Sequence, residues 1–371
     1  MKLAVSPEIL LRSAVNAYDM YLGPGLADLT PMSSSILAEA PQRTLRRYRP
    51  TRRVRPDRPA VLLVPPLAAP ANCFDLRRGC SMVEHFVGMG YPTYLVDYGP
   101  IHYENRDLGL EHWTDEVIPE AIKQVSRDTG GRPVQPVGWC LGGIMTLLAV
   151  AADPELPVAS VAMVASPFDF TQVRMMAPVR RLAKLTGGAL GTALYRTLGG
   201  APAPLVSAGF RLTGIDRLVK KPIWLAEHMA DRETLAHTQA IDSYMSGMLA
   251  YPGRTFGQLY HDFFRVNALA NGVLSLGDRE IKLADVKVPV LSVAGSADVL
   301  APKAAVHHVG DILPNSPLVR LETAPGGHLG VLTGKSAVRT TWVYLDEFLA
   351  ETAPKMAPLP GSARLVPKAR A

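Results

Sequence analysis

Hydrophobic positions are gathered in short apolar runs along the chain. Segments long enough to form helices separate these runs. Runs that are apolar throughout are typical of strands buried on both faces, and the intervening segments are long enough for helices. The six runs span 60–64, 93–97, 134–139, 158–165, 288–294 and 318–323. We therefore predict an α/β fold, a mostly parallel, doubly wound sheet with helices on both faces.

The remaining segments are predicted to flank or cover this sheet. Residues 8–22 have the apolar spacing of an amphipathic helix that ends at Gly23-Pro24-Gly25. Residues 168–285 separate the fourth run from the fifth and are too many for an ordinary crossover, so we expect a cap over the strand ends. The predicted divisions are 1–58 for the N-terminal helix and an arginine-rich lead-in, 59–167 with 286–352 for the core, 168–285 for the cap, and 353–371 for a disordered tail.

The composition indicates a folded chain rather than a disordered or membrane-spanning one. Of 371 residues, 48% are hydrophobic and 19% are charged, which is too apolar for intrinsic disorder. No apolar run approaches the roughly 18 residues that a membrane-spanning helix needs. Pro7, Glu8 and Arg12 stand where a signal peptide has its apolar segment, so we expect a cytoplasmic protein.

The net charge of +6 owes much to eight arginines between residues 43 and 58. Pro50, Pro56 and Pro59 exclude a regular basic helix there. We predict a solvated loop leading into the first core strand, with contact to phosphates or anionic lipid as the alternative. No RNA- or DNA-binding motif accompanies the arginines, so we expect no nucleic-acid partner.

Three cysteines, Cys73, Cys80 and Cys140, form no C-x-x-C pair and have no histidine cluster near them in the sequence. This argues against a disulfide framework and a zinc site. We expect no metal and no cofactor, and we interpret Cys73 and Cys80 as small buried hydrophobes.

The third cysteine stands in a different context, between an apolar run and a helix-length segment. Its surroundings have the G-x-C-x-G form, in the sequence Gly138-Trp139-Cys140-Leu141-Gly142-Gly143. In a nucleophile elbow a sharp turn from strand to helix holds the nucleophile in a strained conformation, and small flanking residues prevent collisions. We predict Cys140 as a thiol nucleophile and the backbone amide of Leu141 as an oxyanion donor.

A thiol nucleophile needs a base and a group that orients the base. Asp298 follows the fifth apolar run and His328 follows the sixth, which is the chain order of nucleophile, acid and histidine in such sheets. We predict that Cys140, Asp298 and His328 form a catalytic triad. The loop after the first run would supply the second oxyanion donor, from the amide of Leu67 or Ala68, because Pro65 and Pro66 have no amide hydrogen.

Four longer motifs lie in the span from Arg46 to about Leu349. They are Tyr94-Leu-Val-Asp-Tyr-Gly, Gly138-Trp-Cys-Leu-Gly-Gly, Pro252-Gly-Arg-Thr-Phe and Pro325-Gly-Gly-His-Leu-Gly-Val. With these motifs the sequence resembles the polyhydroxyalkanoate (PHA) synthase family, particularly the short catalytic subunit of the two-component, class III enzymes. The resemblance implies an α/β-hydrolase fold with a cap, in which a cysteine replaces the lipase-box serine.

The resemblance also implies an activity. A 3-hydroxyacyl group would pass from a CoA thioester, a substrate rather than a bound cofactor, to Cys140 and then to the hydroxyl of another hydroxyacyl unit. His328 would act as base and Asp298 would hold its tautomer. A homodimer or a second synthase subunit, and contact with a polyester granule, are the partners to expect.

Two alternatives stay open. Val299 follows Asp298 where family members often have His, and Ala69-Pro70-Ala71 stands where Asn-Arg-Pro is usual. A lipase, esterase or acyl-CoA thioesterase would use the same triad with water as the acceptor. A lipid- or granule-binding scaffold without turnover, attached through the N-terminal helix and the arginine-rich segment, is the second alternative.

Overall fold

The computed structural model describes residues 6–55, 57–177, 180, 197, 199–212 and 215–354. Its centre is an eight-stranded sheet in the order β1-β2-β6-β3-β7-β8-β13-β14. These strands are β1 Ser34–Ala40, β2 Arg43–Tyr48, β3 Ala60–Val64, β6 Thr93–Asp97, β7 Val134–Trp139, β8 Val161–Val164, β13 Val290–Gly295 and β14 Val319–Ala324. The six strands from β6 to β14 are parallel, whereas β2 pairs antiparallel with both β1 and β6.

The predicted α/β fold is confirmed, and each of the six apolar runs contains or overlaps a parallel strand. Along β3 the side chains alternate between the two faces of the sheet. Leu62 and Val64 pack in the hydrophobic cluster on one face, and Val61 and Leu63 pack in the cluster on the other. Both faces of β3 are buried, which is why its sequence is an unbroken apolar run.

The loop predicted for the arginine-rich segment is wrong in its first six residues. Arg43–Tyr48 is strand β2, in which Leu45 and Tyr48 are buried. Its arginines face acidic groups of neighbouring elements: Arg46 Nε lies 3.5 Å from an Asp97 oxygen and an Arg47 nitrogen lies 3.3 Å from Asp128. Strands with so few buried positions carry a weak hydrophobic pattern, so the sequence did not indicate β1, at the edge of the sheet, or β2 beside it.

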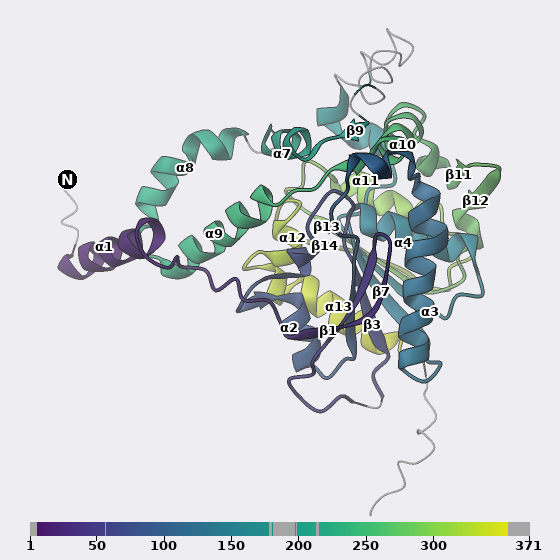
Figure 1. Cartoon of the computed structure of the whole chain (residues 1–371), viewed down its shortest axis with the longest axis horizontal. Coiled ribbons are helices and arrows are strands. Elements are labelled where there is room, and N and C mark those ends of the chain that lie inside the picture. Colours follow the sequence, from purple (N-terminus) through teal and green to yellow (C-terminus); the bar gives the residue numbers. More distant parts are fainter. Residues whose placement is uncertain are drawn as a thin grey trace, which may run out of the picture.

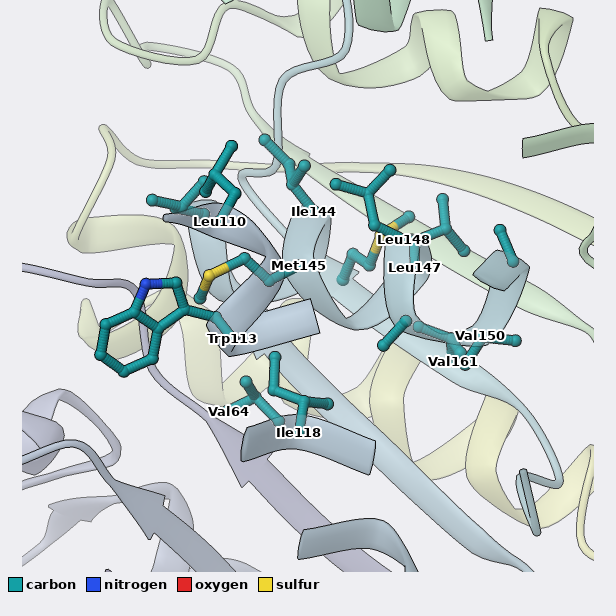
Figure 2. Close-up of a cluster of buried hydrophobic side chains, with 14 of the residues drawn as sticks. Val64, Leu110, Trp113, Ile118, Ile144, Met145, Leu147, Leu148, Val150 and Val161 are labelled. Atoms are coloured by element: carbon teal, nitrogen blue, oxygen red, sulfur yellow. The ribbon is translucent and has the colours of Figure 1, made fainter. Parts of the chain in front are cut away.

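Helices cover both faces of the sheet (Figure 1). On one face α3 (Ile118–Asp128) and α4 (Leu141–Ala152) pack over β3, β7 and β8. Figure 2 shows side chains of α4 gathered with Trp113 over the sheet residues Val64 and Val161. The other face is covered by α2 (Met82–Gly88) and α13 (Thr341–Glu351).

The predicted cap contains several helices beside and above the strand ends. It includes β9 Gly200–Ala201, α7 Ala203–Leu212, α8 Ile215–Glu227, α9 Arg232–Ser246, β10 Tyr251–Pro252 and α10 Gly253–Gln258. Helix α1 (Pro7–Tyr21) lies with α8 and α9 in an arm that projects from the sheet (Figure 1). The Asn16 side chain donates to the Met229 carbonyl at 2.9 Å, and Arg232 pairs with Asp19 at 2.6 Å.

The last part of the predicted cap covers a helix rather than the strand ends. The hairpin β11 Val273–Leu276 and β12 Arg279–Lys282 packs against α4 through Leu274 and Ile281. The divisions predicted from the sequence remain predictions. Most of the predicted tail, from 355 onward, lies outside the described residues.

Short elements complete the described part of the chain. They are β4 Asp75–Arg77, β5 Cys80–Ser81, α11 Lys303–His307 and α12 Gly330–Thr333, the 3-10 turns Ala71–Phe74, Tyr103–Asp107, Phe170–Gln172, Arg174–Met176, Ala268–Asn271, Leu283–Asp285, His308–Asp311 and Ala337–Arg339, and the π-helical turns His112–Val117 and Leu259–Arg265. Among the described helices, none is both long and apolar enough to cross a membrane.

The packing of α4 on the sheet predicts a large cost for truncating its buried side chains. Leu148 is fully buried, so Leu148→Ala should lower the free energy of unfolding by about 3 kcal/mol through lost burial and a cavity. Leu11, which is 67% exposed on α1, is the matched control, and Leu11→Ala should change it by less than about 0.5 kcal/mol. Urea unfolding of both variants measures the difference, and equal effects would contradict this packing.

Candidate active site

Cys140 stands at the sharp turn between β7 and α4. Its backbone has φ 52° and ψ −122°, a conformation that costs free energy for any residue except glycine. Two hydrogen bonds hold the turn: the Cys140 amide donates to the Val164 carbonyl at 2.9 Å, and the Ser166 hydroxyl donates to the Cys140 carbonyl at 2.7 Å. The strand, turn and helix that the G-x-C-x-G motif predicts are therefore present.

The three glycines of the motif stand where neighbouring atoms lie too close for a side chain. A Cβ on Gly138 would lie 2.5 Å from the Cα of Gly143. A Cβ on Gly142 would lie under 3.0 Å from the carbonyl oxygen of Val64, and one on Gly143 would lie under 3.0 Å from the Ser166 hydroxyl. The motif therefore packs β7 and α4 against each other and against the chain that leaves β3.

Backbone strain recurs after the neighbouring strands. Ala165, directly after β8, has φ 52°, and Ala68, in the loop after β3, has φ 60°. Together with Cys140 they place a left-handed residue other than glycine after each of three adjacent strands. Such residues are held by their surroundings and gather at functional sites.

The structure brings the three predicted triad residues together. His328 Nδ1 lies 2.8 Å from Asp298 Oδ2, and the other oxygen of Asp298 accepts the backbone amides of Leu300 and Ala301 at 2.8 and 2.9 Å. The Asp298 side chain is fully buried. Because Nδ1 is bonded to Asp298, Nε2 is the ring nitrogen left for the hydrogen bond between His328 and Cys140.

Opposing effects act on the pKa of His328. Burial lowers it, but the negative charges of Cys140 and Asp298 and the hydrogen bonds to both groups outweigh burial and raise it to about 10. Nearby negative charge favours the protonated imidazole. The site therefore stabilises a proton on His328 when Cys140 is a thiolate.

Trp139 supports the histidine, a role that sequence reasoning missed. Its indole nitrogen donates to the His328 carbonyl at 3.2 Å, and the two rings lie 5.2 Å apart. Trp139 is 4% exposed. Its place beside Cys140 in the motif is the signal that could have indicated it.

The predicted oxyanion donors lie at the ends of two elements that meet at the elbow. Leu141 is the first residue of α4, and the first amides of a helix have no partner within it. Leu67 and Ala68 are buried in the loop after β3, and the Ala68 carbonyl accepts the Leu249 amide at 2.9 Å. The donor roles of Leu141, Leu67 and Ala68 remain predictions.

Two tyrosines of the predicted cap stand close to Cys140 and were also missed. Tyr244 in α9 is 2% exposed, and Tyr251 in β10 is partly buried. Burial raises the pKa of both phenols, and the nearby Cys140 raises it further. They lie about a hundred residues after the nucleophile, and no local pattern marks them.

The other two cysteines have purely internal contacts. The Cys73 thiol is fully buried and contacts the Ala71 carbonyl at 3.7 Å, and the Cys80 thiol contacts the Thr333 carbonyl at 2.8 Å. Burial raises the pKa of both thiols, that of Cys80 to about 11. Within the described ranges, no three His, Cys, Asp or Glu side chains are grouped to hold a metal ion.

Comparison with characterised sequences gives a consistent set of relatives. The "Poly(3-hydroxyalkanoate) polymerase subunit PhaC" of Synechocystis is 26% identical over 293 residues, and that of Haloferax mediterranei is 23% identical over 302 residues. The protein of the same name from Thiocystis violacea is 23% identical over 361 residues, which is 94% of this chain and 98% of the relative. The chain is similar in sequence to these proteins named poly(3-hydroxyalkanoate) polymerases.

The polymerases differ in how much of their length this chain matches. The matches to the Haloferax and the Synechocystis polymerases each cover 78% of this chain. They cover 58% of the Haloferax polymerase and 77% of the Synechocystis polymerase. No family model matches the sequence.

Solved structures confirm the α/β-hydrolase fold expected from the resemblance to the polymerases. The α/β-hydrolase GrgF from Penicillium sp. sh18 superposes with a TM-score of 0.52 at 18% identity and covers 87% of this chain and 99% of its own. The mouse α/β-hydrolase domain-containing protein 10 gives 0.50 at 16% identity, with 86% and 99% covered.

Close packing at the elbow predicts the effect of one added methyl group. Gly142→Ala should force the loop after β3 away from α4, because the new Cβ would meet backbone atoms of Val64 and Pro65. We expect about 2 kcal/mol of lost stability. Gly209→Ala is the matched control in α7, where a Cβ meets nothing within 4 Å. Thermal unfolding compares the two variants, and a stable Gly142→Ala would contradict the close approach.

The charge environment predicts a shift in the titration of His328. In Cys140→Ala the main cause that raises the pKa is removed, so the pKa should fall from about 10 toward 6.5. Because the folded-state pKa lies above the unfolded one, protonation of His328 stabilises the wild-type fold below about pH 6.5, and this stabilisation is lost as the pH rises through 10. NMR titration of the imidazole measures the shift. Cys80→Ala is the control that should leave it unchanged, and an unshifted His328 in Cys140→Ala would disprove the coupling.

Proposed function

We propose that the chain is an acyltransferase of the PHA synthase type, which moves 3-hydroxyacyl groups from CoA thioesters through a Cys140 acyl-enzyme to a hydroxyl acceptor. The observation that carries the proposal is a thiol, Cys140, at the elbow of an α/β-hydrolase fold in a chain whose reported relatives are named polymerases. A cysteine nucleophile suits a thioester donor, because transfer of an acyl group between two thiols is nearly isoenergetic.

In the first half-reaction His328 accepts the proton of the Cys140 thiol. The thiolate attacks the thioester carbonyl carbon, and the backbone amide of Leu141, with that of Leu67 or Ala68, stabilises the resulting oxyanion. The bond from carbon to the CoA sulfur then breaks. The departing CoA thiolate takes the proton from His328, which leaves an acyl group on Cys140.

In the second half-reaction the acceptor is the hydroxyl of another hydroxyacyl unit. His328 removes the hydroxyl proton, the oxygen attacks the acyl carbon, and the bond from carbon to the Cys140 sulfur breaks. The proton returns from His328 to the thiolate, and an ester has formed. The buried carboxylate of Asp298 stabilises the imidazolium in both halves and fixes the tautomer.

Chain growth requires that water does not take the place of the hydroxyl acceptor. The side chains beside Cys140 are apolar or aromatic and almost inaccessible, with Trp139, Tyr244 and Leu67 each 4% exposed or less. Low water activity at the acyl-enzyme favours transfer. A lipase, esterase or thioesterase would share the first half-reaction and differ in admitting water.

The names of the relatives also support an inference about the partner proteins of this chain. The relative from Thiocystis violacea matches almost end to end and is named a polymerase subunit. We infer that this chain, too, is a class III catalytic subunit that works with a second subunit. A homodimer, contact with a granule and a cytoplasmic location are further parts of the proposal.

Incubation with radiolabelled 3-hydroxybutyryl-CoA tests the function. Wild type should release CoA and carry label on a thiol, which then extends into ester-linked oligomer. Cys140→Ala should lose CoA release by at least about 1,000-fold, because nucleophile, base and oxyanion site act as a unit. Cys80→Ala, which removes a thiol held against the Thr333 carbonyl, should keep it.

The fate of the label separates the competing functions. Free 3-hydroxybutyrate released in a Cys140-dependent reaction would replace the synthase proposal with a thioesterase. Absence of CoA release from wild type, with and without a PHA synthase partner subunit, would reject acyl transfer from CoA and favour the scaffold.

A further inference from the structure

Tyr244 carries a buried hydroxyl that no group of the protein satisfies. The residue is 2% exposed, and its Oη has no hydrogen-bond partner among the described residues. A buried hydroxyl without a partner costs free energy, so such groups are rare and often serve a ligand. Removing the oxygen alone, as in phenylalanine, would avoid this cost.

The position of Tyr244 places its ring beside the candidate active site. Its ring lies 6.4 Å from the ring of Trp139, the neighbour of Cys140. The chain that leaves α9 is fixed to the loop after β3, because the Leu249 amide donates to the Ala68 carbonyl and Gly247 stands beside Pro70. Tyr244 thus lies between the elbow and the loop predicted to complete the oxyanion site.

The electrostatic neighbours of the phenol agree with this position. After burial, the groups that raise the pKa of Tyr244 are Cys73, Cys140 and Tyr251. Tyr244 and Cys140 also belong to one packed group of side chains, which includes Trp139 and Ala68. The phenol is therefore a neighbour of Cys140, as its place beside Trp139 also indicates.

The chemistry of the acyl unit indicates which atom would meet it. A 3-hydroxyacyl group on Cys140 has two oxygens. The carbonyl oxygen accepts hydrogen bonds from the backbone amides of the oxyanion site. The other oxygen is the 3-hydroxyl, on the second carbon beyond the carbonyl carbon. That hydroxyl also needs a partner when it is buried, and among the aromatic side chains near Cys140 Tyr244 offers one.

We propose, on the basis of the function proposed above, that the Tyr244 hydroxyl binds the 3-hydroxyl of the acyl unit on Cys140 and selects 3-hydroxyacyl over plain acyl thioesters. A site built to hydrogen-bond a substrate hydroxyl rejects the analogue that lacks it, since the site group then stays unpaired. Tyr244 is in this respect a specificity residue, and the triad and oxyanion donors act on both kinds of substrate.

The test compares 3-hydroxybutyryl-CoA with butyryl-CoA in wild type and Tyr244→Phe. The readouts are kcat/KM for CoA release and the mass of the acyl-enzyme on Cys140. Wild type should prefer the hydroxy substrate by about 10- to 100-fold. In Tyr244→Phe the value for 3-hydroxybutyryl-CoA should fall, so that the ratio lies within about threefold of one.

A matched control distinguishes loss of recognition from loss of structure. Tyr94 is also buried, but its hydroxyl donates to Asp128, the last residue of α3. Tyr94→Phe should lower the melting temperature and keep the substrate ratio. Tyr244→Phe should keep or raise the melting temperature, because its hydroxyl loses no partner.

Each remaining outcome decides a different point. A ratio that Tyr244→Phe leaves unchanged, an equal fall for both substrates, or a lower melting temperature of Tyr244→Phe would overturn the specificity role while the acyltransferase proposal stands. If wild type releases CoA from neither thioester, the proposed function fails and the inference that rests on it fails too.

Discussion

The arrangement of the site depends on how closely three backbones meet at the elbow. Strand β7, helix α4 and the chain leaving β3 approach so tightly that Gly138 and Gly142 leave no space for a Cβ. This contact turns Cys140 into its strained conformation and sets the start of α4 beside the loop that holds Leu67 and Ala68. Van der Waals repulsion therefore fixes where the sulfur stands relative to the backbone amides, before any charge or hydrogen bond contributes.

Charge then organises what the packing has positioned. Asp298 is buried and accepts two backbone amides in addition to His328, so its orientation is determined by three donors. Such a carboxylate is held ready for an imidazolium without reorganisation during reaction. Trp139 fixes the other side of the His328 loop through its indole nitrogen. The polar part of the site is therefore rigid.

The sequence predicted the elements whose signal is local. Largely apolar runs indicated the parallel strands because both faces of the central sheet are covered, and Cys140, Asp298 and His328 were singled out because each stands within five residues after such a run. Strands β1 and β2 were missed because only Leu45 and Tyr48 are buried in them. Tyr244 was missed for another reason, since its relation to Cys140 arises from tertiary packing across a hundred residues and leaves no pattern in the chain.

The three left-handed residues after β3, β7 and β8 have a consequence for how this chain can change over evolutionary time. At Ala68 and Ala165 the strain belongs to the backbone shape alone, so glycine relieves it and leaves every side-chain function intact. At Cys140 the same relief would remove the thiol. Selection for stability would therefore let glycine enter the first two positions freely, and persistent cysteine at the third would mark strain that is retained for chemistry.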